Sequence, residues 1–369
     1  MRVLVAMSGG VDSSVAAAVL TESGHEVVGA TLKLWGGATD SGCCSVADVD
    51  DARRVAQQLG VDHHVFNFTD AFEESVVTPY VVDHASGRTP NPCIECNRSI
   101  KFGLLLERAT RLGFDALATG HHARVVGGDG SGGAGLSLRR GSDKKKDQSY
   151  VLSMLSAGEL TRVVLPVGEM TKSEVRARAA ALGLRTADKP DSQDVCFIHS
   201  GRGRRSFLAD RMELHGAELV DASSGAVVGT VPAGELVTVG QRRGLGVAVD
   251  GRRRYALTVD VGARQITVGT SDDAVGARVT VDRATWVGPA LSQRDRAYAQ
   301  TSAHGAAAPC TWEGDAVVFD EPQPLVAPGQ TVALYDAADP DAVVGSAVAM
   351  ASSSPSMVAP PSAPPSALA

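Results

Sequence analysis

The sequence predicts an α/β fold in which an N-terminal doubly wound parallel sheet is followed by β-rich domains. Apolar segments typical of strands alternate with helical segments over the N-terminal half of the chain, the pattern of a parallel sheet covered on both faces. The first strand runs into a glycine turn that opens a helix. Past about Phe207 the segments become short, β-branched and separated by glycine, which predicts one or two β domains.

Hydrophobic periodicity places the elements of the parallel sheet. Residues 45–59 are one example: Val49, Ala52, Val55 and Leu59 lie on one helical stripe, and a glycine follows it. The predicted strands are 2–7, 26–35, 63–68 and 114–120, and the predicted helices are 11–23, 45–59 and 97–112. Ligands of such sheets bind beyond the carboxyl ends of the strands, which is where the first glycine turn lies.

The segments after the last of these strands are less regular. Residues 127–146 combine glycine, serine and charge without periodicity, which predicts a mobile surface loop. Thr171 to Glu174 form a capping box for a helix that ends near Gly183. The segment 189–200 predicts a charged turn followed by a short apolar strand that contains Cys196.

Length and composition indicate a chain of several domains. At 369 residues the chain should hold about two or three, and its 44% hydrophobic content is ordinary for a globular protein. The domains are predicted at 1–205, 206–285 and 286–350. The remainder, 351–369, carries no charged residue and five of the 17 prolines, so we expect a disordered tail.

Charge and targeting signals limit the classes of function. A net charge of −7 argues against a protein that coats nucleic acid nonspecifically. Local basic clusters still allow RNA binding; they lie at Arg202, Arg204 and Arg205, at Arg242 and Arg243, and at Arg252 to Arg254. We expect no signal peptide and no membrane span, and therefore a cytoplasmic protein. The absence of a coiled-coil repeat favours a monomer.

The glycine turn after the first strand has the form of an anion cradle. Ser8 to Ser14 read SGGVDSS, where glycines let successive backbone N–H groups converge and the helix dipole favours negative charge. The turn is not a Walker loop, because no lysine occurs before Lys33. We therefore expect a phosphate at this turn. His121 and His122 follow a later strand, and because neighbours on a strand point to opposite faces, a substrate contact is favoured over a metal site.

The cysteines are too sparse for a disulfide framework; they stand at 43, 44, 93, 96, 196 and 310. Cys93 and Cys96 occupy a proline-rich turn just before a predicted helix, whose dipole would lower a thiol pKa. A second C-x-x-C for a structural zinc is missing. Cys93, Cys96 and Cys196 are an alternative ligand set for an iron–sulfur cluster with an open position. For the remaining three, we expect small buried hydrophobes.

Six motifs together resemble the tRNA-specific 2-thiouridylases, members of the PP-loop ATP pyrophosphatase superfamily. They are SGGVDSS, GRTPNPCIECN followed two residues later by IKF, TGHHAR, KDQSYVL, DSQDVCFI and VGQRRGLG. Their order and spacing match the family from Val3 to about Gln330. The resemblance implies an adenine nucleotide alpha hydrolase-like PP-loop domain, a small central β-rich domain and a C-terminal β-barrel.

The resemblance also implies which residues act. Cys96 matches the nucleophilic cysteine, and Cys196 the cysteine that carries a persulfide. ATP, with Mg, is implied at Ala6, Met7, Ser8, Gly9, Gly10, Val11, Asp12, Ser13, Leu32 and Gly120. The target base and tRNA are implied at Asn91, Pro92, Cys93, His121, Lys146, Asp147, Gln148, Tyr298 and Gln330.

The implied reaction makes 2-thiouridine at the wobble position of tRNAs for Lys, Glu and Gln. ATP adenylates the C2 oxygen with loss of pyrophosphate, and sulfur then arrives from a cysteine persulfide, releasing AMP. The persulfide attacks C2 directly or after reduction by Cys96, and the resulting disulfide is reset by external thiols. A cysteine desulfurase or a relay protein is the implied sulfur donor.

The sequence departs from the usual family pattern at several positions. Many members have aspartate where Cys93 stands, so the third thiol keeps a [4Fe-4S] cluster open as an alternative to a persulfide relay. His122 replaces a common tyrosine, and Ala297 lacks the arginine of many members. Two other functions also remain: a ligase or amidotransferase that adenylates a small molecule, which would not need Cys96 and Cys196, and a nucleotide-binding regulatory module, which would not need the β domains.

Overall fold

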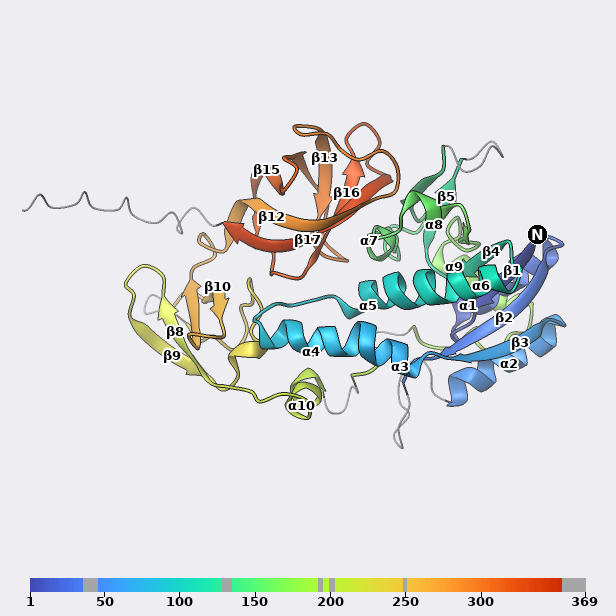
Figure 1. The fold of residues 1–369 in the computed structure, drawn as a ribbon, viewed down its shortest axis with the longest axis horizontal. Helices are drawn as coiled ribbons and strands as arrows, with labels where there is room; N and C mark the ends of the chain where they lie inside the picture. Colours follow the sequence, from blue (N-terminus) through green and yellow to red (C-terminus); the bar gives the residue numbers. More distant parts are fainter. Residues whose placement is uncertain (36–45, 128–134, 192–194, 199–202, 248–250, 354–369) are drawn as a thin grey trace, which may run out of the picture.

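The computed structural model describes residues 1–35, 46–127, 135–191, 195–198, 203–247 and 251–353. Three sheets organise this part of the chain: an N-terminal parallel sheet, a small central sheet and a large C-terminal sheet (Figure 1). The C-terminal sheet lies above two long helices, and the parallel sheet lies at their far end (Figure 1). In these ranges, none of the helices combines the length and the apolar character needed to cross a membrane.

The N-terminal sheet is doubly wound, as predicted. Its order is β3-β2-β1-β4-β7 with every pair parallel, and its strands are β1 (Arg2–Ala6), β2 (Glu26–Lys33), β3 (Asp62–Asn67), β4 (Ala116–Thr119) and β7 (Val163–Val164). Strand β1 is central and buried on both faces. Val3 and Val5 pack with α1 (Val11–Glu22), α2 (Val46–Leu59) and α9 (Lys172–Ala181), whereas Leu4 packs with the other core. The alternating faces of one strand therefore build two separate cores.

Two long helices cover the second face. The first joins α3 (Thr69–Phe72), the π-helical η1 (Glu73–Val77) and α4 (Thr78–Ala85); the second joins α5 (Pro92–Glu95), the π-helical η2 (Cys96–Leu105) and α6 (Leu106–Arg111). They run side by side (Figure 1). The first was not predicted. The prediction that the second begins at Asn97 was wrong, because the Asn91 side chain caps the helix and Pro92 occupies its first turn.

Two further local predictions were wrong and one is confirmed. The predicted loop 127–146 contains β6 (Ser137–Arg140), which forms a hairpin with β5 (Ala123–Val126); residues 128–134 lie outside the described residues. Cys196 lies in a turn and not in a strand, because 195–198 form no ladder. The capping box is confirmed: Thr171 accepts from the backbone N–H of Glu174, whose carboxylate accepts from that of Thr171.

The central sheet is small and follows α10 (Gly203–Ala209). Its order is β10-β11-β8-β9, with strands β8 (Ala217–Asp221), β9 (Val227–Val231), β10 (Tyr255–Asp260) and β11 (Gln265–Gly269). Leu219, Ile266 and Val268 form part of its own core. The short 3-10 helix η3 (Gly234–Leu236) follows β9. The central sheet and the C-terminal sheet together confirm the predicted change to β structure past about Phe207.

The C-terminal sheet closes into an antiparallel barrel. Its strands are β12 (Val275–Trp286), β13 (Arg296–Gln300), β14 (Ala308–Trp312), β15 (Ala316–Pro324), β16 (Thr331–Asp336) and β17 (Ala342–Ser353). The order β12-β15-β14-β13-β16-β17 is closed by pairing of β17 with β12. Residues 351–353 of the predicted tail belong to β17, and 354–369 lie outside the described residues. The predicted domain boundaries stay a prediction.

Hydrogen bonds between α7 (Ser149–Leu152) and strand β16 join the barrel to the N-terminal part of the chain. The Tyr150 hydroxyl donates to the carbonyl oxygen of Thr331 at 2.9 Å, and the hydroxyls of Ser149 and Tyr335 lie 3.0 Å apart. All of these groups are buried, and burial raises the pKa of Tyr335 to about 12. The hydroxyls therefore act as uncharged, fixed hydrogen-bonding groups.

Replacing Tyr150 with phenylalanine should destabilise this contact. The substitution leaves the Thr331 carbonyl without its buried donor, so the free energy of unfolding should fall by about 1–3 kcal/mol. Urea denaturation followed by fluorescence measures the loss. An unchanged unfolding midpoint for Tyr150→Phe would contradict a stabilising role of this hydrogen bond.

Candidate functional site

The loop after β1 is shaped by backbone contacts that exclude side chains. Gly9 has φ +74°, and a Cβ on it would lie 2.3 Å from the carbonyl oxygen of Asp48. Ser13 and Ser14 donate to the carbonyl oxygen of Gly10 at 3.1 and 2.8 Å. The first N–H groups of α1 thus remain directed at the space beyond the loop, as the predicted anion cradle requires.

Gly120 approaches the same loop from the end of β4. A Cβ at this position would lie 2.6 Å from the backbone of both Asp12 and Ser13. Leu32 lies on β2, next to β1, and is buried. The residues predicted for ATP, from Ala6 to Ser13 together with Leu32 and Gly120, therefore lie on adjacent elements, β1, α1, β2 and the end of β4.

A chain of ion pairs surrounds the Asp12 carboxylate. Lys172 contacts Asp12 at 2.7 Å and Asp191 at 2.9 Å, and Lys146 contacts Asp191 at 2.8 Å. His122 Nε2 lies 3.1 Å from Asp12. Burial of Asp12 favours its neutral form, but hydrogen bonds with His122 and Lys172 outweigh this and hold its pKa below the usual range. The site therefore holds ionised carboxylates and ammonium groups in contact at neutral pH.

A second cation lies on the other side of the loop. Lys189 donates to the carbonyl oxygen of Gly9 at 2.9 Å and contacts Asp48 at 2.6 Å and Asp51 at 2.8 Å. Burial lowers the pKa of Lys189, but its hydrogen bonds to the two carboxylates outweigh this effect and raise the pKa. Sequence reasoning missed the roles of both Lys172 and Lys189. Their only signals were a capping box and a charged turn, far along the chain from the loop they contact.

Several residues predicted to touch tRNA hold the β5–β6 hairpin in place. The Asp147 carboxylate pairs with Arg140 at 2.8 Å and accepts from the backbone N–H groups of Gly141 and Ser149. Gln148 Oε1 accepts from the backbone N–H of His122 at 2.8 Å. His121 Nδ1 lies 2.7 Å from the Thr119 hydroxyl, and burial keeps the pKa of His121 well below its ordinary value.

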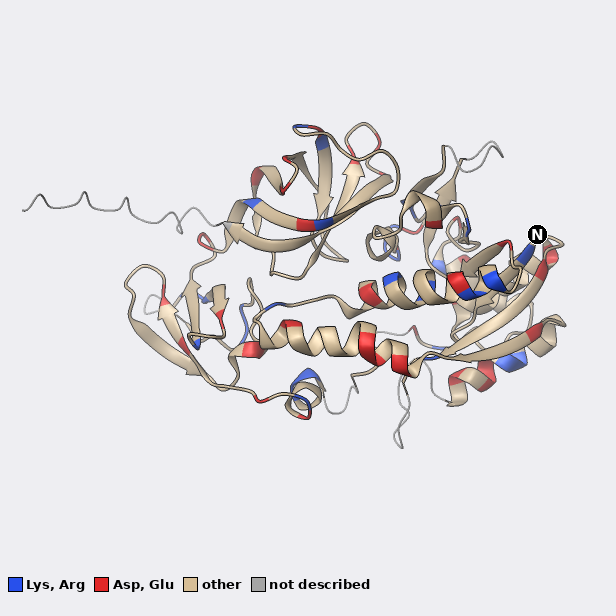
Figure 2. Cartoon of the chain, viewed as in Figure 1, with Lys and Arg blue, Asp and Glu red and all other residues tan. Residues whose placement is uncertain are grey.

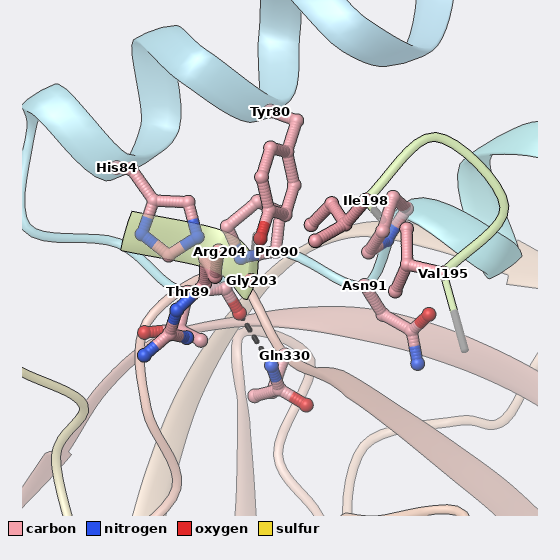
Figure 3. A pocket seen from close by; sticks show the side chains of 11 residues that line it. Tyr80, His84, Thr89, Pro90, Asn91, Val195, Ile198, Gly203, Arg204 and Gln330 are labelled. Atoms are coloured by element: carbon pink, nitrogen blue, oxygen red, sulfur yellow. Dashed lines mark hydrogen bonds between the residues drawn. The ribbon is translucent and has the colours of Figure 1, made fainter. Parts of the chain in front are cut away.

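A pocket of about 500 Å³ lies between the two long helices, α10 and the barrel (Figure 3). It is lined by Tyr80, His84, Thr89, Pro90, Asn91, Pro92, Val195, Ile198, Gly203, Arg204 and Gln330. Asn91 and Pro92, predicted to receive the base, thus share one cavity with Gln330, a predicted substrate-binding residue, whereas Cys93, also predicted to receive the base, does not line it. The Gln330 amide donates to the carbonyl oxygen of Thr89, which fixes the barrel against this turn. Tyr298 does not line the pocket; it packs partly buried against the N-terminal core.

The functional cysteines lie on the two segments that flank the pocket. Cys93 follows Pro92 and is exposed, whereas Cys96, one helical turn later, is 8% exposed and belongs to the apolar core that Cys196 also contacts. Cys196 stands between the pocket residues Val195 and Ile198. The predicted position of Cys93 and Cys96 before the helix was wrong, because both lie within it.

The structure bears on the iron–sulfur alternative and on the cysteines expected to be small buried hydrophobes. Within the described ranges, no group of three His, Cys, Asp or Glu side chains is placed to hold a metal ion. Cys93, Cys96 and Cys196 are not grouped as such a ligand set in these ranges, so the structure gives no support to the iron–sulfur alternative. Cys310 is buried in the barrel, where burial raises its pKa to about 12, as expected of a small hydrophobe. Cys43 and Cys44 lie outside the described residues.

The basic clusters are distributed over the central region. Arg204, on α10, lines the pocket, and its guanidinium donates to the carbonyl oxygen of Leu236 at 2.8 Å. Figure 2 shows the basic character of this short helix, whose sequence carries arginine and no lysine. Arg242 and Arg243 are exposed, and Arg202 lies outside the described residues.

The chain is similar to known proteins along most of its length. Residues 1–200 match the family model described as a tRNA methyl transferase HUP domain, and 277–349 match an aminomethyltransferase β-barrel domain. The chain is 46% identical to the tRNA-specific 2-thiouridylase MnmA of Acidothermus cellulolyticus, over 91% of this chain and 94% of the relative. It is 43% identical to those of Salinispora arenicola and Rhodococcus jostii, over 94% of this chain and 98% and 96% of the relatives.

Replacing Lys172 with methionine should weaken the folded state in a pH-dependent way. Without the ammonium group, the pKa of Asp12 rises and two carboxylates each lose one of their cationic partners, so the free energy of unfolding at pH 7 should fall by about 1–3 kcal/mol. Because the folded-state pKa of Asp12 is depressed, this stabilisation is present above the unfolded pKa and is lost as pH falls below about 4.

Urea denaturation at pH 7 and at lower pH measures the difference between the wild-type protein and Lys172→Met. Lys144→Met is the matched control, because Lys144 is exposed. Equal effects of the two substitutions at pH 7 would show that the Lys172 ion pairs contribute no stability.

Proposed function

The chain belongs to the tRNA-specific 2-thiouridylase family and is a tRNA sulfurtransferase that uses ATP, and we propose how its own residues divide the reaction. The family assignment rests on 46% identity over 91% of the chain. One pocket supports the division of roles. Its lining includes Pro92, which precedes Cys93, and Val195 and Ile198, which lie on either side of Cys196 in the sequence. Each role below is part of this proposal.

ATP binds with its phosphates at the loop after β1. The N–H groups at the start of α1 favour an anion, and the close backbone packing of Gly9 and Gly120 holds the loop in the shape that presents them. Lys172 and Lys189 supply positive charge on either side of the loop. Magnesium, which supplies charge neutralisation for phosphates, fits the carboxylates of Asp12 and Asp191, because it needs only one or two carboxylates besides the phosphates.

The target uridine enters the pocket beside Asn91 and Gln330. A base in an anticodon loop must be turned out of its stack to reach an enclosed site, and a pocket of about 500 Å³ with an aromatic wall suits a flat ring. The apolar side chains of Val195 and Ile198 desolvate the base at the face where Cys196 lies. Adenylation of the C2 oxygen then turns a poor leaving group into AMP.

Sulfur reaches the base through Cys196 and Cys96. The terminal sulfur of a Cys196 persulfide attacks C2, the bond from C2 to oxygen breaks, and AMP leaves with that oxygen. Attack by the Cys96 thiolate on the inner sulfur of Cys196 then releases the new thiocarbonyl and forms a Cys96–Cys196 disulfide. If Cys96 attacks first, it releases hydrosulfide, which attacks C2 with the same products. External thiols reduce the disulfide before the next cycle.

The partners of the reaction complete the proposal. tRNA is the substrate, with the acceptors for Lys, Glu and Gln as the tRNAs concerned. A cysteine desulfurase or a relay protein delivers the persulfide sulfur, and the enzyme acts as a monomer in the cytoplasm. The proposed route transfers sulfur as a cysteine persulfide and not through an iron–sulfur cluster.

Replacing Cys196 with serine should separate the two halves of the reaction. The hydroxyl cannot carry a persulfide, so 2-thiouridine should disappear, while pyrophosphate is still released because the ATP site is intact. The assay combines protein, ATP with magnesium, a cysteine desulfurase with cysteine, and unmodified glutamate tRNA, and is read by nucleoside mass spectrometry and pyrophosphate detection. Thiolation by Cys196→Ser would remove this residue from the proposed route.

Replacing Gly120 with alanine should block ATP binding. The added Cβ would lie 2.6 Å from the backbone at Asp12 and Ser13, so the loop must shift, and the affinity for ATP should fall by at least about tenfold, or 1.4 kcal/mol. Gly158→Ala is the control, since a Cβ there meets nothing within 4 Å. Calorimetric titration with ATP measures both variants, and equal affinities would rule out close packing at Gly120 as a requirement.

A further inference from the structure

His84 lies in the last turn of helix α4. One of its ring nitrogens has a hydrogen-bond partner, and the other has none. The side chain is 1% exposed. Its Nδ1 lies 3.2 Å from the carbonyl oxygen of Glu235, and because a carbonyl only accepts, Nδ1 carries the proton. The Nε2 atom is then a lone-pair acceptor, and it is buried without a hydrogen-bond partner. An unsatisfied buried acceptor is costly, so a ligand that supplies a donor would gain from meeting it.

The surroundings of His84 keep this acceptor uncharged. Burial lowers the pKa of His84 to about 4, and the positive charge of Arg204 acts in the same direction. The Tyr80 ring packs edge-on against the imidazole with 4.6 Å between centroids. At neutral pH the ring therefore presents a lone pair and no N–H at Nε2.

The orientation of the imidazole is held from the far side. The buried Glu235 carboxylate accepts from the backbone N–H of His215 at 3.0 Å and lies 3.0 Å from its ring Nδ1. These bonds hold η3 in place. The carbonyl oxygen of Glu235, which belongs to η3, accepts the hydrogen bond from the His84 Nδ1–H. Glu235 and His215 are positioning residues, because they act on the pocket only through His84.

His84 forms part of the wall of the pocket, beside Tyr80 and Arg204 (Figure 3). The wall thus places an acceptor, His84 Nε2, next to a guanidinium donor. Uracil carries a donor at N3 between two carbonyl acceptors, which complements this pair. Cytosine carries an acceptor at N3 and an amino donor at C4, so its lone pair would face that of Nε2.

We propose that His84 Nε2 accepts the N3–H of the target base and so selects uridine over cytidine. The inference rests on the proposed function of the pocket and adds the group that reads the base. It assigns to His84 a role in substrate specificity, whereas Asn91 and Gln330 mark only where the base lies.

Two substitutions of His84 separate base reading from packing. His84→Asn keeps a donor near Nδ1 for the Glu235 carbonyl but removes the acceptor at Nε2, whereas His84→Gln places an amide oxygen near Nε2 and loses the Nδ1 donor. The assay measures RNA-dependent pyrophosphate release from ATP with two anticodon stem–loops that differ only in uridine or cytidine at the wobble position. This step requires the base but not the cysteines.

The asparagine variant should lose about 10- to 100-fold in kcat/KM with the uridine loop and little with the cytidine loop, so that its discrimination falls. The glutamine variant should stay closer to the wild-type protein. Val82→Ala, at an exposed position on the same helix, is the matched control and should keep wild-type discrimination.

The two outcomes that would overturn the inference are distinct from failure of the sulfur route. If His84→Gln loses discrimination as far as or further than His84→Asn, His84 serves only the packing of α4 on η3. If His84→Asn keeps the wild-type preference for uridine, another group reads the base. Wild-type protein that releases pyrophosphate with the uridine loop but adds no sulfur would contradict the roles of Cys96 and Cys196, while the comparison of His84 variants would still decide this inference.

Discussion

The pairing of β17 with β6 is the constraint on which the rest of the structure depends. Val343 pairs with Leu138 and Ala342 with Arg139, so a hairpin from the N-terminal half extends the sheet of the C-terminal barrel. Arg140 reinforces the junction, because its guanidinium stacks 3.8 Å from the Tyr335 ring centroid while it pairs with Asp147. The barrel cannot rotate freely about a linker. Gln330 is therefore held against the turn at Thr89, and a pocket with walls from both halves of the chain exists in the folded state.

The site has two regions that differ in charge: one is built of ion pairs, and the other is lined mainly by uncharged groups. Around the loop after β1, charged groups contact one another in chains such as Lys146, Asp191, Lys172 and Asp12, which suits a polyanion that exchanges partners with them. The pocket instead combines aromatic and aliphatic walls with amides, an uncharged imidazole and the single guanidinium of Arg204, which suits a neutral base that carries carbonyl acceptors. In the proposed function, the charged nucleotide and the neutral ring each have a region of matching character, so neither region has to serve both.

Sequence reasoning predicted the features that depend on local pattern. The parallel sheet, the glycine turn, the capping box at Thr171 and the β-rich second half follow from periodicity and turn chemistry. It failed where tertiary contacts decide. Strand β6 pairs with the edge of β17 as well as with β5, and Lys189 reaches the Gly9 carbonyl across a separation of 180 residues. The pocket acceptor at His84 carried no sequence signal, since its meaning depends on a carbonyl contributed by Glu235.

The start of the second long helix determines how the two cysteines of its first turns differ. Because Asn91 accepts from the N–H groups of Cys93 and Ile94 and proline follows it, the helix begins at a fixed residue. Cys93 then falls in the exposed first turn, and Cys96 falls one turn deeper, in the apolar core that also contacts Cys196. Apolar surroundings exclude water and competing thiols from a persulfide sulfur. The cap therefore decides which cysteine lies in the core that Cys196 also contacts, and which one faces solvent.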